Sequence, residues 1–297
     1  MSDTMASLQR KIGSAKDLQS VVRTMKAMAA SSVGQYENAV RSLDAYYRTV
    51  QLGLTVCVPA NMPANAPAPP TFEPRQDTTA LGVIVIGTDQ GLVGQFNEVL
   101  VSFVTTSLDE LPGKKKLWAI GERILSRLAE THSGPIERFN LPNSISAITP
   151  LVAQILVEME AHREQGDISQ VYLFHNRPKV GSIYTPVSQR LLPLDEAWRR
   201  GIASTPWPTK NLPEVMNAPE QTFLAVVREY IFVSLFRACA ESLASENASR
   251  LAAMQRAEKN IDELLEDLSR TYHRLRQSSI DEELFDVISG FEALGSG

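Results

Sequence analysis

The stretch that decides the fold is residues 247–275, NASRLAAMQRAEKNIDELLEDLSRTYHRL. Along it, apolar or small side chains recur in steps of three and four residues once the position of Glu258 is counted. A helix keeps such a stripe against one partner only if the two supercoil gently, so we expect a second helix to run along it. The residues of the stripe are Asn247, Leu251, Met254, Ile261, Leu265, Leu268, Tyr272 and Leu275.

The partner helix is predicted at the other end of the chain, where a similar stripe runs from Leu8 to Leu54. Gly13 and Gly34 each cost that helix about 1 kcal/mol, which packing against a partner can offset. Residues 1–55 carry seven Lys/Arg against four Asp/Glu, whereas residues 214–297 carry eight against fifteen. These opposite net charges favour pairing, although exposed ion pairs contribute under about 1 kcal/mol each.

Between the helices the sequence predicts an inserted α/β domain. Residues 57–76 form a Pro/Ala-rich connector, and from Pro219 to the C-terminus no further proline interrupts the last helix. We therefore divide the chain into helix 1–56, connector 57–76, α/β domain 77–212 and helix 213–297. The domain is expected to be mostly parallel and Rossmann-like, because strands alternate with helices. Its expected strands are 81–86, 117–120, 170–175 and 183–192, and its expected helices are 122–129 and 148–164.

A glycine-containing turn, GTDQGLVG at residues 87–94, follows the first strand and opens a helix. An α/β fold can hold a phosphate at this point, but the spacing is neither GxGxxG nor GxxxxGK[ST] and no P-loop lysine is present. We interpret Gly87, Gly91 and Gly94 as residues of a structural turn. Nucleotide binding remains the alternative, and no cofactor is assigned.

The other candidates for chemistry have structural interpretations. Cys57 and Cys239 have no ligand-spaced neighbours and are interpreted as small buried hydrophobic residues. The four histidines match no nucleophile motif, and no catalytic or metal-binding residue is assigned. Lys114–Lys116 is expected in a solubilising turn. The acids Glu263, Glu266 and Asp267 lie off the apolar stripe and are expected on a solvated helix face.

Both ends of the chain resemble a known family. The segments MASLQRKIGSAKDLQSVVRTMKAMAA, GTDQGLVGQFN, ASENASRLAAMQRAEKN and YHRLRQSSIDEELFDVISGFEAL are similar to those of the gamma subunit of F-type ATP synthase. The resemblance implies two long antiparallel terminal helices that form a coiled coil, with the α/β domain at their foot. It implies a non-catalytic central rotor stalk that couples ion-driven rotation of the membrane ring to the catalytic sites of the alpha and beta subunits. The further partners are the epsilon subunit and the ring of c subunits.

Four residues carry over from the family as contacts with the beta subunits. Met25 in RTMKAM matches a methionine that faces those subunits, although a place in the coiled-coil core explains it equally well. Arg250 in ENASR matches an arginine coupled to that methionine. Arg276 and Gln277 match a pair that hydrogen-bonds a loop of the beta subunit, and the planar guanidinium of Arg276 suits a carboxylate.

Other features leave alternatives open. Small residues between Ala238 and Ala253 suit either rotation inside a sleeve or close helix packing. The family's TDRG has Gln90 in place of arginine here, and its GLCGG is replaced by residues 91–95, GLVGQ. The segment after the first alanine-rich turn, residues 31–37, also lacks the usual basic residues. These departures suggest a divergent rotor from an alternative ATPase, with the coupling ion, proton or sodium, left open.

Charge and hydrophobicity limit the further classes of function that the sequence allows. A net charge of −5 gives no general attraction to nucleic acid, and no apolar run reaches the roughly 18 residues that a membrane span needs. Any membrane association is therefore expected to be peripheral, and residues 1–16 show no signal or transit pattern. The resemblance implies a location on the cytoplasmic side of a bacterial plasma membrane. An α/β enzyme or nucleotide-binding module that dimerises through coiled-coil arms is the alternative class.

Overall fold

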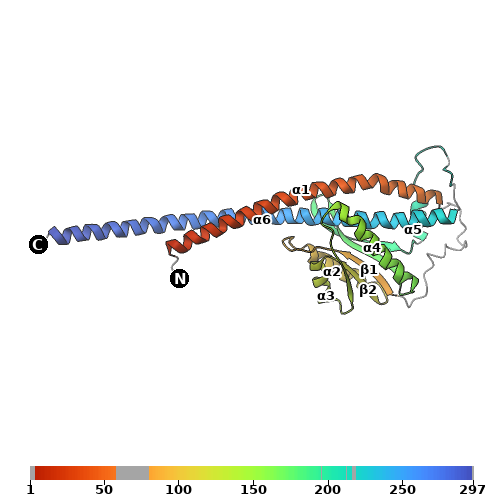
Figure 1. Ribbon diagram of the computed structural model, residues 1–297, viewed down its shortest axis with the longest axis horizontal. Coiled ribbons are helices and arrows are strands. Elements are labelled where there is room, and N and C mark those ends of the chain that lie inside the picture. The colour runs from red at the N-terminus through yellow and green to blue at the C-terminus, as the bar shows by residue number, and fades with distance from the viewer. Residues whose placement is uncertain (1–3, 58–79, 195, 212, 216–218, 296–297) are drawn as a thin grey trace. The chain divides into compact units, whose positions relative to one another are not determined.

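The computed structural model describes residues 4–57, 80–194, 196–211, 213–215 and 219–295 (Figure 1). The chain divides into two compact units, and both long terminal helices contribute to each. The terminal unit comprises Met1–Ala30 and Arg250–Gly297, and the central unit comprises Ser31–Ser249. The predicted connector, 57–76, lies outside the described residues except for Cys57, the last residue of the first helix.

The two long helices are α1, Met5–Cys57, and α6, Pro219–Gly295. Their contacts show an antiparallel arrangement within each unit. In the central unit, Tyr47 contacts Tyr230 while Gly53 faces Val226, so the order along one helix is reversed along the other. In the terminal unit, Arg23 bonds Glu258 while the earlier Gln19 bonds the later Asp262. The predicted antiparallel pair is therefore confirmed.

A five-stranded sheet forms the middle of the central unit, in the order β3-β2-β1-β4-β5. The pairs β1–β2, β2–β3 and β1–β4 are parallel, and only β4–β5 is antiparallel because those strands are joined by a hairpin. The mostly parallel sheet is the predicted one. Its strands are β1 Ala80–Ile86, β2 Lys115–Ile120, β3 Ile136–Phe139, β4 Ile168–Lys179 and β5 Ser182–Leu192.

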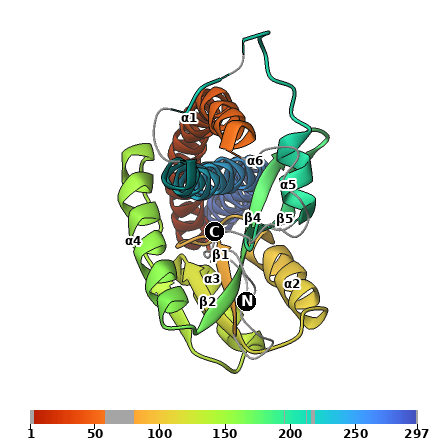
Figure 2. The same ribbon diagram turned by 90° about the vertical axis from the view of Figure 1, so that its right-hand side faces the viewer.

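Helices cover both faces of the sheet, which explains why its middle strand, β1, is apolar throughout. Alternate residues of β1 point to opposite faces: Val83 and Val85 meet α2 (Phe96–Asp109) and α3 (Glu122–Thr131). Ile84 and Ile86 meet the opposite core, to which α4 (Ile145–Glu164), α1 and α6 contribute. Figure 2 shows α2 and α4 on opposite sides of the sheet. Ser144 caps α4 by accepting a hydrogen bond from the Ala147 amide at 3.3 Å.

Some local predictions are wrong. Lys115 and Lys116 begin β2 and are not in a turn, because backbone pairing with β1 at Leu81 and Gly82 holds them regardless of side chain. The short edge strand β3 and helix α5, Glu196–Ala203, were not predicted. Cys239 is buried as expected, whereas Cys57 is only half-buried. Burial raises the pKa of Cys57 and raises that of Cys239 to about 12.

Candidate partner interface on the terminal helices

The terminal unit is held together by a small apolar seam between α1 and α6. Val22, Met254 and Ile261 are buried in it, and Met25 and Leu265 pack half-buried against them. Complete burial of an aliphatic side chain contributes about 1.5–3 kcal/mol, so these three residues contribute substantially to the attraction between the helices. Three residues of the predicted stripe, Met254, Ile261 and Leu265, thus lie on the surface of α6 that faces α1.

Charged contacts flank this seam. Glu258 accepts a hydrogen bond at 2.9 Å from Nε of Arg23 and one at 2.5 Å from Nζ of Lys26. The bonds from Lys26 and Arg23 lower the pKa of the Glu258 carboxyl below its ordinary value. Gln19 also donates to Asp262 across the pair. This is the pairing that the opposite charges of the two ends predicted, and it keeps Glu258 in the apolar stripe without an uncompensated charge.

The four predicted interface residues all belong to the terminal unit. Met25 is half-buried against the apolar seam, so it does contribute to the packing of the pair. Arg250 is half-buried and is the first residue of α6 that belongs to the terminal unit. Arg276 and Gln277 are exposed on α6, and their side chains are accessible to another molecule. The solvated face also appears as predicted, since Glu263, Glu266 and Asp267 are exposed.

An exposed apolar stripe near the end of α6 was missed from the sequence. Ile280, Leu284 and Ile288 recur every four residues and are 46–56% exposed, and Phe285 and Val287 beside them are 69% and 61% exposed. We call these five residues the terminal apolar stripe. Clustered exposed hydrophobic side chains mark surfaces that bind other molecules. The spacing of four was available in the sequence and could have revealed it.

The glycine-containing turn is built from contacts within the chain. At Gly87, an added Cβ would lie 2.3 Å from Cβ of Ile124, so only glycine fits between β1 and α3. Gly94 has a φ of 62°, which favours glycine, whereas Gly91 has open space around it. Asp89 accepts a hydrogen bond from the Glu122 amide at 2.9 Å and so caps the N-terminus of α3.

Further polar groups tie the turn to α2 and α6. The amide of Thr88 donates to Oδ1 of Asn97, and Nδ2 of Asn97 donates to Oγ1 of Thr88 at 2.9 Å. Both residues are buried. Ser249 of α6 donates to the Val93 carbonyl at 2.6 Å. Polar atoms of the turn are therefore engaged in holding the fold, as a structural turn requires.

Small residues of α6 in the central unit serve close packing. Ala238, Ala240, Ala244 and Ser245 are buried in the central unit. Ser242 donates to the Ile86 carbonyl at 3.2 Å, which brings the helix backbone close to the end of β1. Of the two interpretations left open by the sequence, close packing describes this part of the helix.

Two histidines are engaged with carboxylates and are not isolated. His175 on β4 is 4% exposed, and its Nε2 lies 2.9 Å from Oε2 of Glu241 on α6. Arg237 donates to the other oxygen of Glu241 at 2.8 Å. Burial acts to raise the pKa of Glu241, but the bonds from His175 and Arg237 outweigh it and hold the pKa below its ordinary value. His162 on α4 contacts Asp167 and Glu158.

The fold and the interface define a class of protein in which two long antiparallel terminal helices carry an α/β domain inserted between them. The family model described as ATP synthase matches residues 4–294, and the chain belongs to this family. The chain is 25% identical over 293 residues to an ATP synthase gamma chain of Polynucleobacter asymbioticus, and the match covers 97% of this chain and 98% of the relative. A gamma chain of Polynucleobacter necessarius is 26% identical over 294 residues, with the same coverage.

Solved structures share the fold at low sequence identity. The rotor of the Euglena gracilis mitochondrial ATP synthase matches with a TM-score of 0.60 at 19% identity, covering 93% of this chain and 98% of that one. The central stalk of the Tetrahymena thermophila mitochondrial ATP synthase matches with a TM-score of 0.55 at 21% identity, covering 80% and 99%. Within the described residues, no helix has the length and hydrophobicity to cross a bilayer.

Proposed function

We propose that this chain is the central rotor stalk of an ATP synthase. It couples ion-driven rotation of a membrane ring of c subunits to the catalytic sites of the alpha and beta subunits, and performs no bond chemistry itself. The observation that carries the proposal is the match to gamma chains over nearly the whole length of both chains. The location follows from this role: a peripheral position on the cytoplasmic side of a bacterial plasma membrane.

The antiparallel helix pair suits this work physically. A shaft must transmit torque, and two helices that bury a common seam resist bending and twisting better than one. In the terminal unit, Val22, Met254 and Ile261 form that seam, and Glu258 bridges to Arg23 and Lys26 beside it. Two kinds of contact, apolar and ionic, thus oppose slippage of one helix along the other.

We assign the contacts with the beta subunits to Met25, Arg250, Arg276 and Gln277. The exposure of Arg276 and Gln277 supports the assignment, because a partner can reach both side chains. Arg276 can grip a carboxylate with two parallel hydrogen bonds, which are about twice as strong as neutral ones. The terminal apolar stripe lies four to twelve positions beyond Arg276 on the same helix, and we assign it to the same interface. The epsilon subunit and the c ring are assigned to the central unit.

Co-expression with the alpha and beta subunits of the same organism tests this function. We expect the wild-type chain to co-purify with them in a complex that hydrolyses ATP, while the chain alone hydrolyses none. The double variant Arg276→Ala/Gln277→Ala removes the proposed grip, and loss of one charge-assisted pair, at about 1.4 kcal/mol or more, lowers its affinity for the alpha and beta subunits roughly tenfold.

The matched control is Arg274→Ala, because Arg274 is exposed on the same turn of α6. It should assemble as the wild type does. Equal affinity of the double variant and the wild type would refute the assigned contact. ATP turnover by the purified chain alone, or micromolar binding of ATP or NAD in calorimetry, would favour the alternative class of α/β enzyme.

A further inference from the structure

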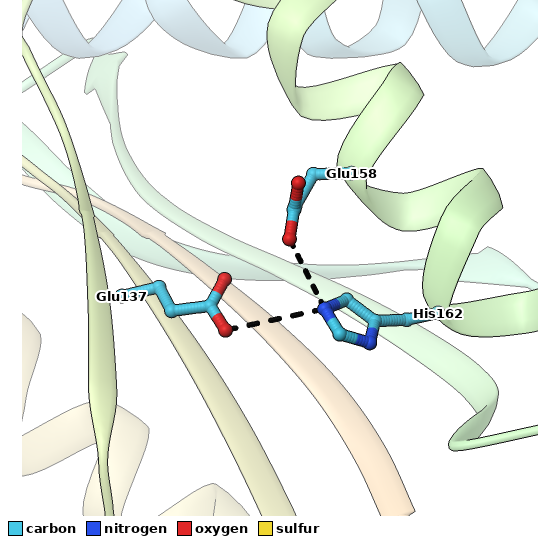
Figure 3. Close-up of side chains that lie close together, drawn as sticks. All are labelled: Glu137, Glu158 and His162. Atoms are coloured by element: carbon cyan, nitrogen blue, oxygen red, sulfur yellow. Dashed lines mark hydrogen bonds and ion pairs between the residues drawn. The ribbon is translucent and has the colours of Figure 1, made fainter. Parts of the chain in front are cut away.

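Three side chains from two elements converge between the β3 edge of the sheet and α4. Glu137 lies on β3, and Glu158 and His162 lie one turn apart on the same face of α4. One ligand atom from each can be chosen so that all three lie within 4.8 Å of one another. Figure 3 shows both carboxylates turned toward Nε2 of the imidazole.

The atoms that meet there are acceptors of hydrogen bonds or of a cation. Nε2 of His162 lies 3.1 Å from Oε1 of Glu158 and 3.9 Å from Oε1 of Glu137. On its other side, Nδ1 lies 2.9 Å from Oδ2 of Asp167. In the tautomer that keeps its proton on Nδ1, toward Asp167, the lone pair of Nε2 lies on the side of the two glutamates. A positive charge among these acceptors is therefore favourable.

Lys116 supplies a positive charge in this structure. Its Nζ lies 2.6 Å from Nε2 of His162 and 3.0 Å from Oε1 of Glu137. Glu137 pairs with this ammonium, while Glu158 and Asp167 contact His162, so three carboxylates gather around one lysine and one imidazole. The carboxylates outnumber the lysine, which favours a cation among them.

We propose that this cluster is a site for a divalent transition-metal ion of the zinc class, which takes the place that Lys116 Nζ holds here. The ligands are Nε2 of His162, Oε1 of Glu137 and Oε1 of Glu158, and water completes the coordination. Neighbouring ligands around tetrahedral Zn²⁺ are about 3.4 Å apart for bonds of about 2.1 Å. The Nε2 distances of 3.1 and 3.9 Å lie on either side of that value, so small side-chain movements assemble the site.

Surrounding groups support these ligands as outer partners of metal sites do. Asp167 fixes the orientation of the imidazole, and Nε1 of Trp118 donates to Oε2 of Glu137 at 2.7 Å. Partial burial acts to raise the pKa of Glu137, but the bonds from Lys116 and Trp118 hold it below its ordinary value. A glutamate carboxyl is ionised at neutral pH even at its ordinary pKa, as a ligand must be. The bound ion would fasten the edge strand β3 to α4.

The test is isothermal titration of the tag-free full-length chain with ZnCl₂, in a Cys57→Ser background that removes the half-buried thiol. We expect one zinc per chain. His162→Gln should weaken binding at least tenfold, and Asp167→Asn should weaken it about tenfold through loss of ring orientation. The control His273→Gln removes an exposed histidine of α6 and should bind zinc as the wild type does.

Lys116→Gln gives a result that misfolding cannot imitate. It removes the competing ammonium while keeping a side chain of similar length, so zinc affinity should rise about tenfold or more. MgCl₂ should bind at least 100-fold more weakly than ZnCl₂, because magnesium prefers oxygen ligands. The proposal is overturned if His162→Gln binds zinc as tightly as the wild type, if Lys116→Gln leaves the affinity unchanged, or if magnesium binds equally well.

Discussion

Replacing Ile261 by alanine probes the seam between the terminal helices. Ile261 is 6% exposed and packs with Val22 and Met254, which are 6% and 3% exposed. Truncation of a buried isoleucine costs about 2–5 kcal/mol. We expect about 2–3 kcal/mol here, because the neighbours Met25 and Leu265 are only half-buried and can collapse into part of the space. Since about 1.4 kcal/mol corresponds to tenfold, the local opening equilibrium should rise roughly 30- to 150-fold.

Native-state hydrogen exchange, read on peptides covering residues 250–275, measures that opening directly. The matched control is Leu264→Ala, three positions along the same helix, because Leu264 is 49% exposed and its loss should change protection by less than about 0.5 kcal/mol. Peptides of β1 in the central unit should keep their protection in both variants. Similar exchange in Ile261→Ala and Leu264→Ala would refute the conclusion that this seam holds the helices together.

Two further predictions concern the central unit. Tryptophan fluorescence reports its unfolding, because Trp118, Trp198 and Trp207 all lie in this unit. Gly87→Ala should lower the free energy of unfolding by roughly 1–3 kcal/mol, since the added Cβ would lie 2.3 Å from Cβ of Ile124. The control Gly91→Ala should change the free energy of unfolding by less than about 0.5 kcal/mol, because the space around Gly91 is open. Equal urea midpoints for the two variants would contradict this prediction. Glu241→Gln should cost roughly 3 kcal/mol at pH 7, because it removes a buried carboxylate charge that pairs with Arg237 and contacts His175. The Glu241 carboxyl has a lowered pKa in the folded chain, so its contribution is present above the ordinary value of 4.5 and is lost as pH falls below it. The deficit of Glu241→Gln should therefore shrink between pH 5 and pH 3, and a constant deficit would show that charge is not the cause.

The elements with strong periodicity could be predicted from the sequence. Both terminal helices follow from apolar stripes at steps of three and four, and β1 follows from a run of six mostly β-branched residues that is buried on both faces. In each terminal helix the apolar step recurs many times, so a single polar residue in the stripe, such as Glu258, does not hide the helix. The same property explains why residues far apart, such as Val22 and Ile261, could be assigned to one seam.

The elements that were missed lack such repetition. β3 has only four residues, IERF, and pairs with β2 alone at the sheet edge, so its polar residues carry no strand signal. Helix α5 is eight residues long within a proline-rich stretch. The cluster of Glu137, Glu158 and His162 was hidden for the same reason, because one of its members lies on the strand that was not recognised. The proposed contacts of Arg276 and Gln277 rest on resemblance alone, since an exposed pair on a helix has no local pattern.

The measurement that tests the rotor function most directly is single-molecule rotation of the chain inside a complex with its alpha and beta subunits. The alpha and beta subunits are fixed to a surface, and a bead is attached to Val180→Cys in a Cys57→Ser background. Val180 is fully exposed between β4 and β5, so the attachment should leave the packing intact. We predict that ATP drives steady rotation of the bead in one direction. A complex that hydrolyses ATP while the bead stays still or only fluctuates would contradict the account.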